Sequence, residues 1–325
     1  MNNRVAWFLA AVAVGVAPAH GQVLQSPFDA DYGIVDLGAP PGIPANLGGI
    51  AFLDGDTLLI GGSANRAAGA IYQIDVVRDP VSQSIIGFAG AASLYATAPN
   101  IDGGLAFGPD GVLFYAAYPN NLLGQIKPGS LAPDKLIDLN GLPAPVASSV
   151  GTLQFVPAGF PRAGALKVAS YNANLWYEVA LTPDGLGTFD VGGVGPAAPV
   201  AGGPEGIVYI AGSNPGFAAD SILLGEWAAD QVSVYEIDAQ GDPILATRRP
   251  FITQLIGAEG AAIDGRTGDF LFSTFQGGNR VLVVTGFAAV IPEPGAAALV
   301  LWAGGGWAFV RLRRRVARDR SDSAA

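Results

Sequence analysis

A glycine-led segment recurs five times along this chain, and each copy opens a unit of about 50 residues. In each copy the glycine is followed by a short apolar run, as in Gly104-Leu105-Ala106-Phe107. The copies lie at 47–52, 102–107, 150–155, 205–209 and 259–264. Repeats of this length usually form one small sheet each, and such a sheet must stack on its neighbours to bury its apolar faces. The repeat therefore restricts the chain to an array of similar units.

Each unit has the same internal order of turns and apolar segments. An Asp-Gly turn follows the opening segment, for example at Asp54-Gly55. A polar loop, often with asparagine, then separates an apolar second strand from an alternating third strand, and a less regular fourth strand follows. The second strands are expected at TLLIGG, VLFYAAY, ALKVASY, SILLGEW and FLFSTF, and the third at AIYQID, LLGQIK, LWYEVA, QVSVYEID and RVLVVT. Because 46 glycines and 24 prolines also disfavour helices, the chain is predicted to be all-β.

The two ends of the repeat complete each other. The fifth unit has three strands and ends at RVLVVT, whereas an unused strand is expected at the front, at 32–37. Pairing of these segments would close the array into a ring and remove its open edges. We therefore predict a β-propeller over residues 30–287 with five four-stranded blades. The alternatives are six blades, if the connections 185–205 or 240–258 contain further strands, and an open β-sandwich.

Three opening segments carry an acidic residue directly before the glycine, namely Asp102, Glu205 and Glu259. The equivalent positions of the other two units hold Gly48 and Val150. Because the first strand of each propeller blade lines the central channel, the three carboxylates are expected to converge at one mouth. Such oxygen ligands suit Ca²⁺ or Mg²⁺. The sequence thus predicts either a metal site, with Ca²⁺ as its ion, or a solvated polar ring that holds no metal.

The opening segments and the order turn, strand, asparagine loop, strand resemble those of NHL and gluconolactonase-type propellers. Gluconolactonase-like propellers hold a metal ion with a glutamate at a similar first-strand position. The resemblance therefore implies that Glu205 or Glu259 is the counterpart of that glutamate, and that a metal-dependent hydrolase or lactonase is an alternative function. The asparagine and aspartate partners of that family have no assigned positions in this sequence.

Other candidate sites have simpler explanations. Segments 54–56 and 264–269 resemble calcium loops, but neither has enough ligands, so both are expected to be turns. Four aromatic residues could stack on sugar rings, although such residues more often pack between blades. These residues are Trp176, Tyr177, Trp227 and Tyr235.

The residue types that are scarce exclude several kinds of chemistry. The chain has no cysteine, and its only histidine is His20, close to the N-terminus. A Ser-His-Asp triad, thiol catalysis and histidine-ligated metal sites are therefore excluded from the repeat region. Between residues 22 and 290 there are 10 Lys and Arg against 24 Asp and Glu, a formal charge of −14. Such a body repels nucleic acid and anionic lipid, so nucleic acid is not expected as a partner.

The N-terminal segment has the order of an export signal. Arg4 supplies a positive charge, residues 5–17 are apolar, and small residues precede cleavage points after Ala19 or Gly21. This order predicts a secretory signal peptide at 1–21, with a helical apolar region. The body would then extend from 22 to 290.

The C-terminal segment, 291–325, has three parts in a fixed order. Pro292-Glu293-Pro294 is followed by an uncharged span at 295–310 and an arginine-rich tail. The basic residues of the tail are Arg311, Arg313, Arg314 and Arg315, with two more arginines beyond them. The prolines favour an extended backbone, the span could enter a bilayer as a helix, and the arginines would stay on the cytoplasmic side.

These three parts resemble the PEP-CTERM sorting signal of Gram-negative bacteria. The resemblance implies recognition by exosortase at the inner membrane and removal of the anchor at the cell envelope, in bacteria that usually also make exopolysaccharide. An ordinary unprocessed membrane anchor is the alternative. Together with the repeat, these features predict an exported, envelope-sorted, non-catalytic propeller on the outer surface or outside the cell. We expect it to bind or scaffold a component of the envelope or matrix, such as extracellular polysaccharide.

Overall fold

A computed structural model describes residues 21–288 of the 325-residue chain. All but the last residue of the predicted signal peptide, and the whole predicted sorting signal, lie outside these residues. Between residues 21 and 288, no helix has both the length and the apolar character needed to span a bilayer. The helical turns in this range are short 3₁₀ segments such as η1 (Phe28–Ala30) and η3 (Trp227–Ala229).

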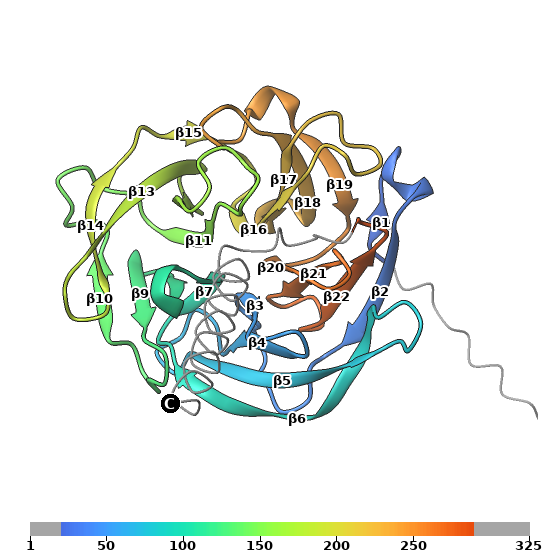
Figure 1. Cartoon of the computed structure of the whole chain (residues 1–325), viewed down its shortest axis with the longest axis horizontal. Helices are drawn as coiled ribbons and strands as arrows, with labels where there is room; N and C mark the ends of the chain where they lie inside the picture. Colours follow the sequence, from blue (N-terminus) through green and yellow to red (C-terminus); the bar gives the residue numbers. More distant parts are fainter. Residues whose placement is uncertain (1–20, 289–325) are drawn as a thin grey trace, which may run out of the picture.

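The described chain forms five antiparallel sheets arranged as the blades of a closed propeller (Figure 1). Blade 1 consists of β3 (Ile50–Phe52), β4 (Thr57–Gly62), β5 (Ala70–Arg78) and β6 (Ile85–Thr97). Blade 2 consists of β7 (Ile101–Phe107), β8 (Leu113–Ala117), β9 (Leu122–Ile126) and β10 (Lys135–Asp138). Blade 3 consists of β11 (Val150–Phe155), β12 (Leu166–Ser170), β13 (Leu175–Pro183) and β14 (Phe189–Val194). Blade 4 consists of β16 (Pro204–Ile210), β17 (Ser221–Glu226), β18 (Gln231–Glu236) and β19 (Arg249–Thr253). Blade 5 consists of β20 (Ala258–Ile263), β21 (Phe270–Thr274), β22 (Val281–Thr285) and β2 (Gly33–Gly38).

The prediction of five four-stranded blades is confirmed, and the six-bladed and sandwich alternatives are not observed in the described residues. The five glycine-led segments form the innermost strands β3, β7, β11, β16 and β20. The two long connections contain β14 and β19, together with a short edge strand, β15 (Ala198–Pro199), which pairs with β13. These strands complete blades 3 and 4, so no residues remain for a sixth blade.

The hydrophobic core is divided into five clusters, one at each interface between neighbouring blades. Leu59 of blade 1 packs with Leu113 of blade 2, for example, and both are fully buried. At the interface of blades 3 and 4, Trp176 and Tyr235 are fully buried. Because aromatic side chains bury large areas, residues of this kind fill the wedge between adjacent twisted sheets.

The ring is closed by the N-terminal segment, as the repeat predicted. β2 pairs with β22 of blade 5, and β1 (Val23–Leu24), which was not predicted, pairs with β19 of blade 4. Between these two strands, Phe28 packs against Phe217 and Phe251 with ring centroids 5.1 and 4.9 Å apart. The segment therefore joins two blades. All five blades lie within residues 21–288, as do the pairings of β1 and β2 that close the ring. This part of the chain therefore contains a complete core and folds as one unit.

Candidate metal centre

The innermost strands of blades 2, 4 and 5 each carry one of the predicted carboxylates at their N-terminal end. Asp102 lies in β7, Glu205 in β16 and Glu259 in β20. The strand register is interrupted at each of these points, between Ile101 and Leu105 in β7 and at the matching places in β16 and β20. β-Bulges of this kind turn a side chain away from its regular direction and are common beside functional sites. Here they coincide with the three acidic residues.

The structure brings the three carboxylates together at one mouth of the channel. Asp102, Glu205 and Glu259 each offer an oxygen that lies within 4.8 Å of the other two. Their exposed fractions are only 1%, 2% and 2%. Among residues 21–288, no hydrogen bond of normal geometry reaches either oxygen of Asp102, Oε2 of Glu205 or Oε1 of Glu259. The three carboxylates thus lie close together and are buried, an arrangement that both the metal site and the polar ring predicted from the sequence would require.

Glycines create the space that the carboxylates occupy. A Cβ atom on Gly103 would come within 2.4 Å of Oε2 of Glu205, and one on Gly151 within 2.7 Å of its Oε1. A Cβ on Gly206 would lie 2.4 Å from the backbone oxygen of Glu259. The glycine after the acidic residue thus has a steric role, because it lets neighbouring inner strands and the acidic side chains approach closely.

Burial and mutual repulsion make these groups reluctant to ionise. Burial raises the pKa of Asp102 to about 7. Burial, followed by the charge of Asp102, raises the pKa of Glu205 well above its ordinary value. Burial and the charges of Glu205 and Asp102 do the same for the pKa of Glu259. A cation among the three oxygens would compensate both effects and favour the charged forms.

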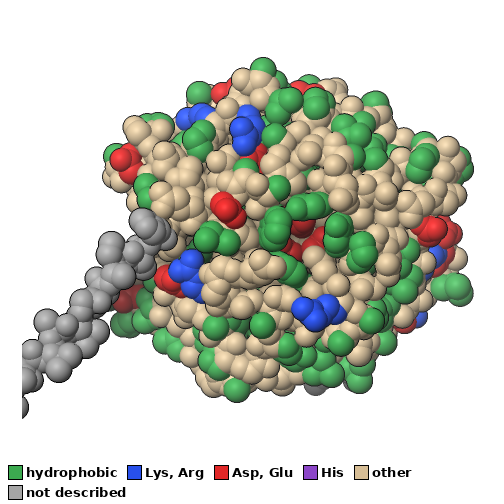
Figure 2. Space-filling view, turned by 180° about the vertical axis from the view of Figure 1, so that it is seen from behind, with side chains coloured by type: hydrophobic (Ala, Val, Ile, Leu, Met, Phe, Trp, Pro, Cys, Tyr) green, Lys and Arg blue, Asp and Glu red, His purple; other side chains and the backbone are tan. Residues whose placement is uncertain are grey.

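Four aromatic side chains surround the acidic cluster, and we call them the aromatic collar. They are Tyr118, Tyr171, Trp227 and Phe275. Successive rings lie 5.7, 6.0 and 6.3 Å apart in edge-to-face arrangements. Together with the three acids, Asn65 and Gln276 they line a cavity of about 280 Å³. In a view of the molecule from behind, red acidic side chains lie at the centre of the ring among green hydrophobic ones (Figure 2).

The collar residues occupy equivalent positions in four blades. Each follows directly after the second strand of its blade, at the end that lies beside the acidic mouth. Blade 1 has Ser63 at this position, so the collar is open on that side. The side-chain oxygen of Asn65, two residues further on, is also buried without a partner. Polar groups thus lie next to Asp102 on the side of blade 1, whereas the other sides are aromatic.

The donor set determines which ion would fit. Three carboxylates and one amide oxygen are hard ligands, which suit Ca²⁺ or Mg²⁺ better than the softer transition metals. The four unpaired carboxylate oxygens already converge, so a cation would supply the partner that they lack. The residues present therefore fit a hard divalent cation, held by Asp102, Glu205 and Glu259 with Asn65 close by.

The other candidates from the sequence lie elsewhere. Asp54 forms a turn by accepting hydrogen bonds from the backbone N–H groups of Asp56 and Thr57. Asp264 accepts from the side chain of Arg78 and the backbone N–H of Arg266. The prediction that segments 54–56 and 264–269 are turns is therefore confirmed.

The aromatic candidates divide into two groups. Trp176, Tyr177 and Tyr235 are buried in the cores between blades, as expected. Trp227 is only half-buried and lines the acidic mouth, so the expectation of core packing was wrong for this residue.

Sequence reasoning did not identify the collar as a set. The signal was present, because four of the five predicted second-strand segments end in an aromatic residue: VLFYAAY, ALKVASY, SILLGEW and FLFSTF. Asn65 was noted only as a loop residue. Its place beside Asp102 depends on contacts between blades 1 and 2, which a repeat pattern does not specify.

Comparison with known proteins gives likenesses of fold only. No protein-family model and no curated protein matches the sequence. The chain is similar to the PQQ-bound aldose sugar dehydrogenase of Streptomyces coelicolor, with 14% identity, 79% of this chain and 98% of that chain covered, and a TM-score of 0.42. It is also similar to a streptogramin B lyase, with 12% identity, coverage of 79% and 98%, and a TM-score of 0.41. A protein provisionally described as a gluconolactonase gives 13% identity, coverage of 82% and 97%, and a TM-score of 0.43.

Proposed function

We propose that this protein is a non-catalytic binding protein of the cell envelope, and that Ca²⁺ in the acidic mouth forms part of its ligand site. The observation that carries this proposal is the convergence of three buried carboxylates whose oxygens lack partners. Burying such groups unpaired costs stability, whereas a bound cation turns the same arrangement into a specific site. A cation there also reduces the charge repulsion from an acidic body, so that an anionic polymer can approach as well as a neutral one.

The aromatic collar supports an oxygen-rich ligand with an apolar face. Hydroxyl oxygens of a sugar can complete the coordination of Ca²⁺, and the C–H face of the sugar ring can pack on an aromatic side chain. Burial raises the pKa of Tyr171, and the charges of Glu205, Asp102 and Glu259 add to this effect. Tyr171 therefore lies close enough to the acidic cluster to be influenced by its charge. The collar is therefore close enough for one ligand to contact both. Extracellular polysaccharide is the partner that this chemistry favours.

Calcium-dependent binding of a neutral polysaccharide tests this proposal. Residues 21–288 are passed over immobilised dextran in Ca²⁺ and in a chelator. We expect retention in Ca²⁺ only, and a loss of retention in Trp227→Ala but not in Tyr95→Ala, a half-buried tyrosine on β6. Binding that is equal in chelator, or equal in the two variants, would contradict the proposed ligand site.

The export and sorting of the protein are proposed from its terminal segments. The order Pro292-Glu293-Pro294, apolar span and arginine tail supports processing by exosortase at the inner membrane. Replacing Pro292 and Pro294 by alanine should leave a precursor in the inner membrane with its tail attached. Mass spectrometry of the membrane and released fractions measures this, and normal processing of the variant would exclude the sorting signal.

A metal-dependent hydrolase or lactonase on the same propeller is the second candidate. It is favoured by the position of the acidic cluster in an accessible cavity, because a cation there keeps positions open for a substrate. The two functions differ in turnover. An enzyme should hydrolyse a sugar lactone in Ca²⁺, Mg²⁺ or Mn²⁺ and lose this activity in Glu205→Gln, whereas a binding protein should bind without product formation.

A further inference from the structure

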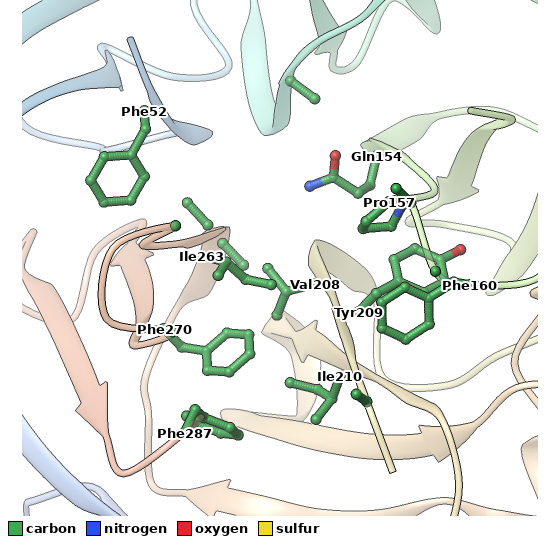
Figure 3. A pocket seen from close by; sticks show the side chains of 18 of the residues that line it. Phe52, Gln154, Pro157, Phe160, Val208, Tyr209, Ile210, Ile263, Phe270 and Phe287 are labelled. Atoms are coloured by element: carbon green, nitrogen blue, oxygen red, sulfur yellow. The ribbon is translucent and has the colours of Figure 1, made fainter. Parts of the chain in front are cut away.

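The other mouth of the channel contains a second cavity, of about 560 Å³. Its floor is formed by the C-terminal halves of the inner strands, and its walls by the loops that follow them, as the close-up in Figure 3 shows. β7 carries Asp102 at the acidic mouth and Phe107 at this one, five residues further along. At the rise of an extended strand the two are about 17 Å apart. The two cavities are thus separate sites on the same strands.

The wall of this cavity is apolar and partly open to solvent. Phe52, Phe107, Phe160 and Ile263 line it and are only half-buried, although they are large hydrophobic residues. In Figure 3 the side chains of Phe52, Val208 and Ile263 lie around the same open space. Removing such surface from water contributes about 25 cal/mol per Å². A ligand that covers these side chains would therefore gain free energy from the hydrophobic effect.

Three polar side chains of the wall are engaged within the protein. Asn214 accepts a hydrogen bond from the backbone N–H of Ala288 and donates one to the backbone oxygen of Ala211. Gln154 donates to the backbone oxygen of Ile207, and its own oxygen accepts from the N–H of Phe155. The hydroxyl of Tyr209 donates to the backbone oxygen of Gly241. These groups hold the wall in place, in contrast to the unpaired oxygens of the acidic mouth.

Charge further limits the ligand. Among residues 21–288, Asp220 is the single charged residue that lines the cavity, and its Oδ1 accepts a hydrogen bond from the N–H of Gly212. No lysine or arginine of this described part lines the cavity, so a carboxylate, sulfonate or phosphate would meet repulsion without a compensating cation from it. Acidic lipids and fatty-acid anions are therefore disfavoured.

We propose that this cavity is a binding site for a neutral apolar small molecule, such as the hydrocarbon part of an uncharged lipid or terpenoid. Its volume lies in the range of sites that enclose a compact organic ligand, roughly 300–1,000 Å³. The concave shape favours such a ligand over a protein partner, which would require a broad exposed face. The site does not depend on the proposed cation, because none of the three carboxylates lines it.

A matched pair of fluorescent probes tests this proposal. N-phenyl-1-naphthylamine is neutral, whereas 1-anilinonaphthalene-8-sulfonate has nearly the same ring system with a negative charge. Titrated into residues 21–288, the neutral probe should bind at least about tenfold more tightly, a difference of about 1.4 kcal/mol. Asp220→Asn should reduce that preference, because its amide oxygen can still accept from Gly212 while the charge is removed. Equal affinities for the two probes, or an unchanged preference in Asp220→Asn, would overturn the proposal.

Variants that fill the cavity locate the bound probe. Ala211→Trp and Ala158→Trp place an indole in the wall at positions outside the strands. Each should weaken binding of the neutral probe about tenfold or more, whereas Ala229→Trp, in the exposed turn beside the acidic mouth, should not. Melting curves establish that each variant is folded. Undiminished binding in both folded filling variants would place the probe elsewhere and contradict the assignment.

Discussion

The two mouths of the channel are built on the same strands but differ in their charge and in how their polar groups are paired. At one mouth, β7, β16 and β20 are bulged and carry buried carboxylates with unpaired oxygens. At the other, the same strands pair regularly and present apolar residues, and the polar side chains noted above have internal partners. The comparison shows that one propeller strand can present different chemistry at its two ends, which are about 17 Å apart.

The difference also concerns stability. Unpaired buried carboxylates oppose folding, whereas a half-exposed apolar wall merely leaves some hydrophobic stabilisation unused. A buried acid elsewhere in the protein shows the usual solution, because Glu226 is fully buried but paired with Arg248 and Tyr235. The acidic mouth lacks such partners. We therefore expect it to respond strongly to cations and to pH, and the apolar mouth to respond to neither.

The largest expected effect is loss of the ring on which both mouths depend. Deleting 22–38 removes β1, β2 and Phe28, which would expose strand edges on blades 4 and 5. We expect aggregation or a large fall in melting temperature. The milder change Phe28→Ala should lower the free energy of unfolding by about 3–5 kcal/mol. Asp29→Ala is the control, and it should change this free energy little because Asp29 is exposed. A stable, monomeric deletion variant would refute closure by this segment.

The next effect distinguishes the acidic mouth from Glu226, a buried acid that is paired. Ca²⁺ should raise the stability of residues 21–288 by about 2.7 kcal/mol at a hundredfold excess over its dissociation constant. Glu205→Gln with Glu259→Gln should abolish this gain, because the amides keep the shape but lose the charge. Glu226→Gln is the matched control, since it should lower stability through its lost ion pair but keep the response to Ca²⁺. Thermal melts in Ca²⁺ and in chelator measure all three, and identical wild-type curves would exclude the cation.

A smaller effect should follow from crowding the acidic mouth by one methyl group. In Gly103→Ala the new Cβ would displace the carboxylate of Glu205, so we expect Ca²⁺ to bind about tenfold more weakly, a change of about 1.4 kcal/mol. Gly265→Ala is the matched control at the apolar mouth, where a Cβ would meet no atom within 4 Å. Calorimetric titration with Ca²⁺ compares them, and equal affinities would show that this glycine has no part in the site.

The last effect concerns the pH dependence of stability. Because folding raises the pKa of Asp102 to about 7 and raises those of Glu205 and Glu259, the folded state retains protons that the unfolded chain releases. This contribution to stability is fully present below the unfolded pKa of about 4 and is lost as the pH rises through the folded values. In chelator, the melting temperature should therefore fall between pH 5 and 8, with a shallower slope in Glu205→Gln with Glu259→Gln. Equal slopes would show that Glu205 and Glu259 do not titrate in this range, because Asp102 is present in both proteins.

The sequence predicted the fold well because the repeat specifies local structure five times over. The glycine openers, the Asp-Gly turns and the unused strand at 32–37 identified the inner strands, the blade number and the closure. β1 was missed because two residues, Val23 and Leu24, form no pattern before their partner β19 is known. The long connections were ambiguous for the same reason.

The candidate site could be predicted only in part. The acid before the glycine in three repeats indicated that the carboxylates converge, but not that they are buried and unpaired, because this depends on how closely neighbouring blades approach at Gly103 and Gly151. The collar could have been predicted from the aromatic residues that end four of the second strands, although Trp227 was wrongly expected in the core. No sequence pattern indicated the apolar cavity, because its walls combine loops from different blades.

The most direct test of the acidic mouth as a metal site is to locate the ion itself. Crystals of residues 21–288 grown with Tb³⁺, an oxygen-seeking substitute for Ca²⁺, would reveal the metal by its anomalous scattering. Our account predicts one strong peak between Asp102, Glu205 and Glu259, at about 2.3–2.6 Å from their oxygens, and its loss in Glu205→Gln with Glu259→Gln. A wild-type crystal with no peak among these residues, or with ions bound elsewhere only, would contradict it.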